Sequence, residues 1–130
     1  MPLRGISVVD FTQWAAGPSA CAILADWGAE VIKLEHPQGG DPSRGILAYS
    51  VLSFTTFNLV LELDNRGKKS LTVDMKLDQG KEIVHRLIEK SDIFVTSFLP
   101  DTLKSLKLDY KTLSQINPKL IYARLSAYGE

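Results

Sequence analysis

The chain has 130 residues with 45% hydrophobic content, and 15 lysines and arginines balance 15 aspartates and glutamates. This zero net charge argues against a nucleic-acid-binding protein that works through a broad basic face, and no stretch is apolar enough for a membrane span or signal peptide. One cysteine and two histidines cannot form an internal disulfide or a Cys/His zinc site, so we expect no metal and a reducing cytoplasm.

The first 35 residues predict a strand–helix–strand unit. Residues 6–11 form an apolar, β-branched run that predicts a buried strand, and residues 12–18 predict a loop. Apolar residues then recur at helical spacing up to Trp27, and Gly28 stands where a glycine commonly ends a helix. Residues 30–35 predict a second strand, so the unit should be a right-handed parallel crossover.

The middle of the chain is less regular. Residues 36–45 contain two prolines and three glycines and predict a loop. Residues 47–63 are apolar with mixed periodicity, and we favour a helix within them. Residues 64–67 predict a turn, and the alternation in residues 70–74 predicts a third strand.

The last third of the chain again alternates between helix and strand. Asp78 is a candidate N-cap for a helix whose apolar residues share one face, and residues 92–96 predict the next strand. Asp109 is a candidate cap for a short helix that ends near Asn117, and residues 120–125 predict a final strand.

This order of elements predicts an α/β fold: an open, mostly parallel sheet with helices on both faces. The chain stops soon after its last predicted strand, although parallel strands are normally covered on both faces. We therefore expect residues 1–130 to be the first part of a larger domain. The alternative is that the last strand is the edge of a complete small domain.

In such sheets, ligands bind beyond the carboxyl ends of the strands, so the loops there are the candidate sites. Small residues in loop 12–18 would let a ligand approach backbone N–H groups, or they serve only a tight turn. His36 directly follows the second strand and could contact a ligand or be solvated. Phe98, beside hydroxyl groups, could pack on a ring or a thioester chain, or belong to the core.

Four cations lie within eleven residues around the third strand: Arg66, Lys68, Lys69 and Lys76. Such side chains donate charge-assisted hydrogen bonds to phosphate oxygens, so this cluster suits a phosphorylated ligand. A solvated surface turn is an equally good interpretation.

No catalytic constellation is complete. The chain has no GxGxxG motif, which argues against a nicotinamide or flavin site. We expect Cys21 to be a buried, inert thiol and His85 to be exposed. Asp10 and Asp74 stand near strand ends, where they could be acid–base groups, caps or loop anchors.

Taken together, these segments resemble the N-terminal part of the class III CoA-transferase (CaiB/BaiF) family, which includes formyl-CoA transferase and α-methylacyl-CoA racemase. The residues that carry the resemblance are 3–12 (LRGISVVDFT), 16–18 (AGP), 24–35 (LADWGAEVIKLE), 40–45 (GDPSRG), 65–76 (NRGKKSLTVDMK), 91–95 (SDIFV), 117–122 (NPKLIY) and 126–129 (SAYG).

The resemblance implies a Rossmann-like domain that binds CoA, acyl-CoA and carboxylic acid substrates, and interlocked homodimers. It implies transfer of CoA between carboxylic acids through an aspartyl anhydride and an enzyme–CoA thioester. The aspartate is expected beyond Glu130, so no catalytic residue is expected here. The alternatives are a racemase of the same family, which uses a His/Asp acid–base pair, and a nucleotide-binding module without catalysis.

The resemblance also implies the positions that contact CoA. They lie in the four loops after the strands: Gln13, Ala15, Ala16, His36, Val73, Lys76, Ser97, Phe98 and Thr102. The chain departs from the family pattern at His36, Ser97 and Ser105, where arginine, asparagine and arginine are common.

Overall fold

The computed structural model describes residues 1–45 and 58–129. Its strands are β1 (Ser7–Phe11), β2 (Glu30–Glu35), β3 (Lys69–Thr72), β4 (Ile93–Thr96) and β5 (Ile121–Arg124). They form one sheet of order β3-β2-β1-β4-β5 in which every neighbouring pair is parallel. The predicted α/β fold with a parallel sheet is therefore confirmed.

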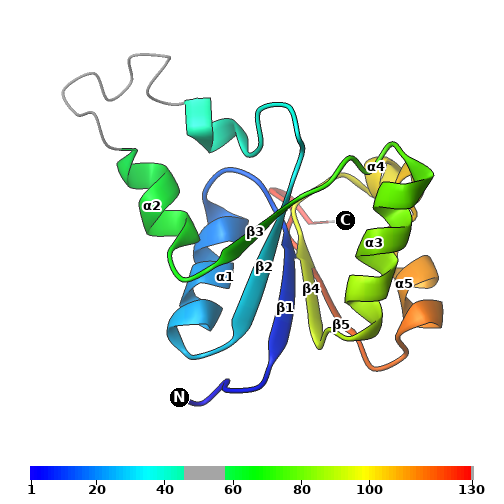
Figure 1. The fold of residues 1–130 in the computed structure, drawn as a ribbon, viewed down its shortest axis with the longest axis horizontal. Coiled ribbons are helices and arrows are strands. Elements are labelled where there is room, and N and C mark those ends of the chain that lie inside the picture. Colours follow the sequence, from blue (N-terminus) through cyan, green and yellow to red (C-terminus); the bar gives the residue numbers. More distant parts are fainter. Residues whose placement is uncertain (46–57, 130) are drawn as a thin grey trace.

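Helices cover both faces of the sheet, as predicted (Figure 1). One face carries α1 (Ala16–Asp26) and α2 (Leu59–Asn65), and the other carries α3 (Asp78–Glu89), α4 (Pro100–Ser105) and α5 (Tyr110–Ile116). A short 3-10 helix, η1 (Pro42–Gly45), follows β2. From the central strand β1, the chain adds β2 and β3 toward one edge of the sheet, and it then adds β4 and β5 on the other side of β1. The strand order therefore reverses between β1 and β4, which is where open α/β sheets bind ligands.

Each face of the sheet has its own apolar core, because successive side chains on a strand point to opposite faces. Val8 and Val95 pack with Cys21 of α1 on one face. Val9 and Phe94 pack with residues of α3 and α5 on the other, where the core is larger. Both faces of β1 and β4 are thus buried, which explains why these strands are continuous apolar runs in the sequence.

The structure differs from the prediction at two helix starts. Leu77, in an extended conformation, precedes α3 without a side-chain cap, and Asp78 is the first helical residue, so its prediction as the N-cap was wrong. α4 was not predicted, because six residues are too few to show a helical period. Pro100 begins it, where its missing N–H leaves no hydrogen bond unmade. Asp109 does cap α5, accepting a hydrogen bond from the Thr112 N–H at 3.2 Å.

The helix favoured within residues 47–63 is present in part. α2 begins at Leu59, and the Asn58 side chain caps it by accepting a hydrogen bond from the Leu61 N–H at 3.1 Å. The rest of that prediction, residues 47–57, lies outside the described residues. Among the helices described, none is both long and apolar enough to cross a membrane.

The first turn of α3 packs tightly on the turn after β3. A Cβ added to Gly80 would stand 2.0 Å from the Asp74 carbonyl oxygen, far inside van der Waals contact. Only a residue without a side chain therefore lets α3 lie against residues 73–76, which line the candidate site described below.

Replacing Gly80 with alanine should therefore lower the free energy of unfolding by about 1–3 kcal/mol, because backbone must move to relieve the contact. Urea denaturation followed by circular dichroism would measure this. The control is Gln79→Ala, at the neighbouring exposed position of the same helix, which should change stability by less than about 0.5 kcal/mol. Equal stability of the two variants would contradict the packing argument.

Candidate functional site

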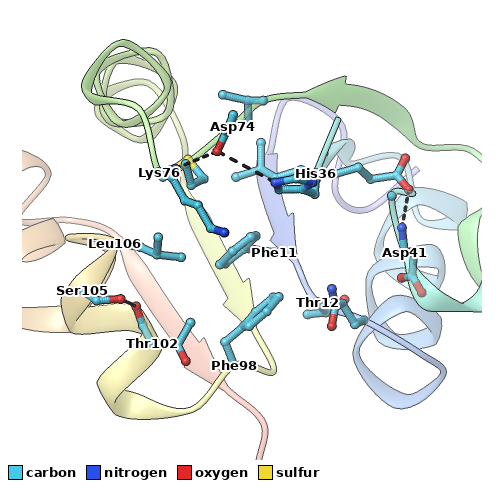
Figure 2. A pocket seen from close by; sticks show the side chains of 16 residues that line it. Phe11, Thr12, His36, Asp41, Asp74, Lys76, Phe98, Thr102, Ser105 and Leu106 are labelled. Carbon is cyan, nitrogen blue, oxygen red and sulfur yellow. Dashed lines mark hydrogen bonds and ion pairs between the residues drawn. The ribbon is translucent and has the colours of Figure 1, made fainter. Parts of the chain in front are cut away.

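A cavity of about 420 Å³ opens at the carboxyl ends of β1, β2 and β3 and beside the segment that follows β4. We call it the strand-end cavity. Figure 2 shows residues of all four loops around it: Thr12 after β1, His36 after β2, Lys76 after β3 and Phe98 after β4. The cavity therefore lies at the reversal of strand order, where the first and fourth loops diverge to opposite faces of the sheet.

The interior of the strand-end cavity is mostly apolar. Phe11 and Phe98 stack with ring centroids 4.2 Å apart and planes 15° from parallel, and the Phe11 ring also lies 6.4 Å from that of Phe94 in the core. Leu34, Val73, Met75 and Leu106 complete the apolar lining. Phe98 thus anchors its loop to the core while its ring presents a surface that a flat or aliphatic ligand group can contact.

The rim of the cavity is polar and carries the groups that can bind an anion. The Nε2 atom of His36 lies 3.9 Å from Oδ1 of Asp74. The Gln38 N–H donates to Nδ1 of His36 at 3.1 Å, and the Gln38 carbonyl oxygen lies 3.4 Å from the same atom. The shorter contact favours the neutral tautomer that carries its proton on Nε2. The Lys76 backbone N–H donates to the same Oδ1 at 2.9 Å, and the Lys76 side chain extends over the cavity toward Phe11 (Figure 2).

The loop after β1 is held from two sides. The Gln13 N–H donates to Oγ of Ser97 at 3.0 Å, and the Trp14 N–H donates to Oδ1 of Asp41 at 3.3 Å. Trp14 has a φ of 67°, a left-handed conformation that is rare for a bulky residue and persists only where the surroundings enforce it. The second and fourth loops therefore fix the backbone of the first.

The loop after β2 is anchored by Glu35. Arg44 donates two hydrogen bonds to its carboxylate, at 2.8 and 2.7 Å, and the Ser70 hydroxyl and Asp41 N–H donate two more. Burial by itself raises the pKa of Glu35, but these hydrogen bonds outweigh it and lower the pKa from 4.5 to about 2. Glu35 is thus ionised at neutral pH and holds residues 36–45 against the sheet.

The sequence model of CoA-transferase family III matches residues 3–130. The chain belongs to CoA-transferase family III. The resemblance to this family, expected from the sequence motifs, is confirmed.

Individual relatives agree with this assignment. The chain is 47% identical over 132 residues to a probable fatty acyl-CoA transferase of Mycobacterium tuberculosis, covering 98% of this chain and 32% of that protein. It is 40% identical over 130 residues to the succinyl-CoA–L-malate CoA-transferase alpha subunit of Chloroflexus aurantiacus, covering 100% of this chain and 30% of the subunit.

A solved structure also matches. The crystal structure of a CaiB/BaiF family protein from Brucella suis superimposes with a TM-score of 0.87 at 33% identity, covering 99% of this chain and 34% of that one. The chain thus spans about a third of the length of the relatives it matches.

The structure brings most of the predicted CoA-contacting positions of this family III chain together. Those that line the strand-end cavity are Gln13, His36, Val73, Lys76, Phe98 and Thr102. Ser97 lies behind Gln13 as its hydrogen-bond acceptor, and Ala15 and Ala16 lead into α1 outside the lining. Whether these residues bind CoA stays a prediction.

The predicted cation cluster is separated by the fold. Arg66, Lys68 and Lys69 precede or begin β3, and none of the three lines the cavity, which opens at the carboxyl end of that strand. Arg66 pairs with Asp26, Lys69 with Glu30, and the buried Lys68 with Asp10. The prediction that all four cations face one ligand was therefore wrong, and only Lys76, which follows β3, lines the cavity.

Three further candidate residues from the sequence lie outside the cavity lining: Cys21, Asp10 and His85. Cys21 is buried, as expected, and burial raises the pKa of its thiol to about 12, which disfavours the reactive thiolate at neutral pH. Asp10 is a buried anchor that accepts hydrogen bonds from Thr12 and Lys68. His85 is half-buried, with Nε2 2.9 Å from the Lys107 carbonyl oxygen, so the expectation that it is exposed was wrong.

Sequence reasoning missed the role of Asp41, which lines the cavity and is buried. Burial raises the pKa of Asp41, but the Ser43 N–H and the Lys33 ammonium together lower it overall. The signals in the sequence were its place in a loop after a strand and within segment 40–45 (GDPSRG), one of the segments that carry the family resemblance. Among residues 1–45 and 58–129, no group of three or more His, Cys, Asp or Glu side chains could hold a metal ion.

Glu35 makes a testable contribution to stability. Because its pKa is lowered on folding, it stabilises the native state above about pH 4.5, and this contribution is lost as the pH falls toward 2. Glu35→Gln should lower the free energy of unfolding at pH 7 by about 1–2 kcal/mol, allowing for screening at the solvent-exposed Arg44.

Urea denaturation at pH 7, 5 and 3 would measure this, and the variant should lose less stability on acidification than the unchanged chain. Glu30→Gln is the matched control, because Glu30 lies on the same strand but its pair with Lys69 is largely exposed. Parallel pH curves for the Glu35 variant and the unchanged chain would refute this account.

Proposed function

We propose that this chain forms the CoA-binding part of an enzyme that moves CoA between carboxylic acids. The observation that supports this most is the composition of the strand-end cavity: an aromatic and aliphatic interior with Lys76 and His36 at its rim. CoA has the complementary chemistry, since it joins an adenine ring and phosphates to an uncharged pantetheine arm. The proposal concerns the whole protein, of which relatives are about three times longer.

Each group around the cavity has a role in this proposal. The Phe98 ring would pack on the adenine ring or the pantetheine arm. The Lys76 ammonium would donate charge-assisted hydrogen bonds to phosphate oxygens, and His36 would do so from Nε2. Gln13 and Thr102 add neutral hydrogen-bonding groups to the lining of the cavity.

For the reaction, we propose the aspartyl route of class III transferases. An aspartate carboxylate attacks the thioester carbonyl, which forms a mixed anhydride and releases the CoA thiolate. The thiolate then attacks the aspartyl carbonyl, which gives an enzyme–CoA thioester and frees the first carboxylate. The acceptor carboxylate attacks this thioester, which expels the CoA thiolate and forms a second mixed anhydride. The thiolate then attacks the acyl carbonyl of the acceptor, which gives the new acyl-CoA and frees the aspartate carboxylate. By the resemblance to the family, we propose that this aspartate lies beyond Glu130.

The same resemblance extends the proposal to assembly and location. We propose that residues 1–130 are the N-terminal part of the large domain, that the whole protein forms interlocked homodimers, and that it acts in the cytoplasm on acyl-CoA and a free carboxylic acid.

One observation supports a second candidate reaction of the same family. His36 and Asp74 lie 3.9 Å apart at the cavity, and a histidine paired with a carboxylate can exchange the proton next to a thioester carbonyl. In deuterated water, such an exchange would place deuterium at that carbon of a branched acyl-CoA, whereas transfer to an added carboxylate would not require it.

The binding proposal predicts that the chain binds CoA in calorimetric titration and that Lys76→Ala weakens binding about tenfold, because a phosphate contact with a charged group is lost. Lys69→Ala removes the same charge at the amino-terminal end of β3, away from the cavity, and should leave the affinity within about twofold. No heat at millimolar CoA, or equal losses in both variants, would overturn the assignment of the cavity to CoA.

A further inference from the structure

Four charged side chains lie buried together on the face of the sheet that α1 covers, and one of them, Asp41, also lines the strand-end cavity. Asp10, Lys33 and Asp41 are each at most 2% exposed, and the Lys68 side chain is also 2% exposed. Lys68 binds Asp10 at 2.8 Å and Lys33 binds Asp41 at 2.9 Å, so the group consists of two neutralised pairs. We call it the buried tetrad. Charged residues are rarely buried, and well-packed apolar residues often give equal or greater stability at such places.

The Lys33–Asp41 pair contacts the loop after β1 on both sides of Gln13. The Lys33 ammonium donates to the Thr12 carbonyl oxygen at 3.0 Å. Asp41 directs Oδ2 at Lys33 and uses Oδ1 to accept hydrogen bonds from the Trp14 and Ser43 N–H groups. This one pair therefore fixes a carbonyl on one side of Gln13 and an N–H on the other, so that Gln13 and the left-handed Trp14 take a single conformation.

Apolar packing could not replace these contacts, because it has no direction. A carbonyl oxygen and an N–H group are positioned only by a donor and an acceptor of matching geometry. Thr12 and Gln13 line the strand-end cavity, and so does Asp41 itself. The directional contacts thus fall on the backbone that a ligand would meet, rather than on the sheet below it.

We infer that the Lys33–Asp41 pair is a positioning device for the proposed CoA site: it holds residues 12–14 in the conformation that binds the ligand. Neither side chain reacts. This inference rests on the proposed function for its ligand, but the effect on the loop exists in the free protein. It also explains why a carboxylate stands at position 41. Its Oδ1 accepts from the two backbone N–H groups, and its Oδ2 pairs with the Lys33 ammonium.

The first test is Asp41→Asn, which keeps the shape of the side chain and removes its charge. Trp14 is 56% exposed and reports on the loop, and Trp27→Phe removes the second tryptophan of the chain from the signal. In that background, Asp41→Asn should increase the fast local motion of Trp14 in time-resolved fluorescence anisotropy. The dissociation constant for CoA should rise at least about tenfold, because a misplaced loop loses its contacts.

The second test separates positioning from stability. Lys33→Met with Asp41→Leu removes both charges and leaves the Asp10–Lys68 pair balanced. This double variant should regain thermal stability relative to Asp41→Asn, because no buried charge is left without its partner, yet its CoA affinity should stay low. The control is Asp64→Asn, a buried aspartate on α2 that accepts a hydrogen bond from Ser19, which should leave Trp14 motion and CoA affinity unchanged.

The outcomes distinguish the two proposals. CoA affinity equal to that of the unchanged chain in Asp41→Asn or in the double variant overturns the positioning role. If the double variant does not fold, Asp41→Asn decides alone. If the unchanged chain does not bind CoA, the proposed function fails, and unchanged Trp14 anisotropy in Asp41→Asn would then refute the effect on the loop as well.

Discussion

The buried tetrad is the constraint on which the rest of the structure depends. Asp10 lies in β1, Lys33 lies in β2, Lys68 directly precedes β3 and Asp41 belongs to the loop after β2. The tetrad therefore joins three neighbouring strands. Removing one partner would leave an uncompensated charge in a low-dielectric interior, at a cost of about 3–5 kcal/mol. The three strands and the loop after β2 can therefore shift only together. The loops that line the strand-end cavity are held in place with them.

Glu35 extends the constraint outward. It lies two residues after Lys33 on the same strand, and it binds the Asp41 N–H, Arg44 and Ser70. Asp41 is thus held through its side chain by Lys33 and through its backbone by Glu35. Residues 36–45, which have a loop-like sequence, are fixed at both the near end and the middle. This arrangement lets His36 project over the cavity from a rigid base.

Much of the fold could be predicted from the sequence, because each buried strand is a continuous apolar run and the βαβ order restricts the topology. The rule that ligands bind at carboxyl strand ends also led to His36, Lys76 and Phe98. The same pattern could not separate Lys76 from Lys68, since cations before and after one short strand look alike in sequence, although only Lys76 lines the cavity and Lys68 is buried against Asp10. Nor could it identify Asp41, whose role arises from Lys33 and Trp14 in other segments.

The distribution of charge explains how a neutral chain can present a site for an anion. Arg66, Lys69 and Lys68 are neutralised by acids at the amino edge of the sheet or in its interior. Arg44 is likewise bound to Glu35, whereas the Lys76 side chain extends over an apolar cavity (Figure 2). A single ammonium beside a low-dielectric wall attracts a phosphate more strongly than the same charge in open water. Because these four cations are paired, the attraction for an anion is concentrated at the carboxyl ends of the strands. The buried tetrad fixes the loop after β1 at the same end of the sheet.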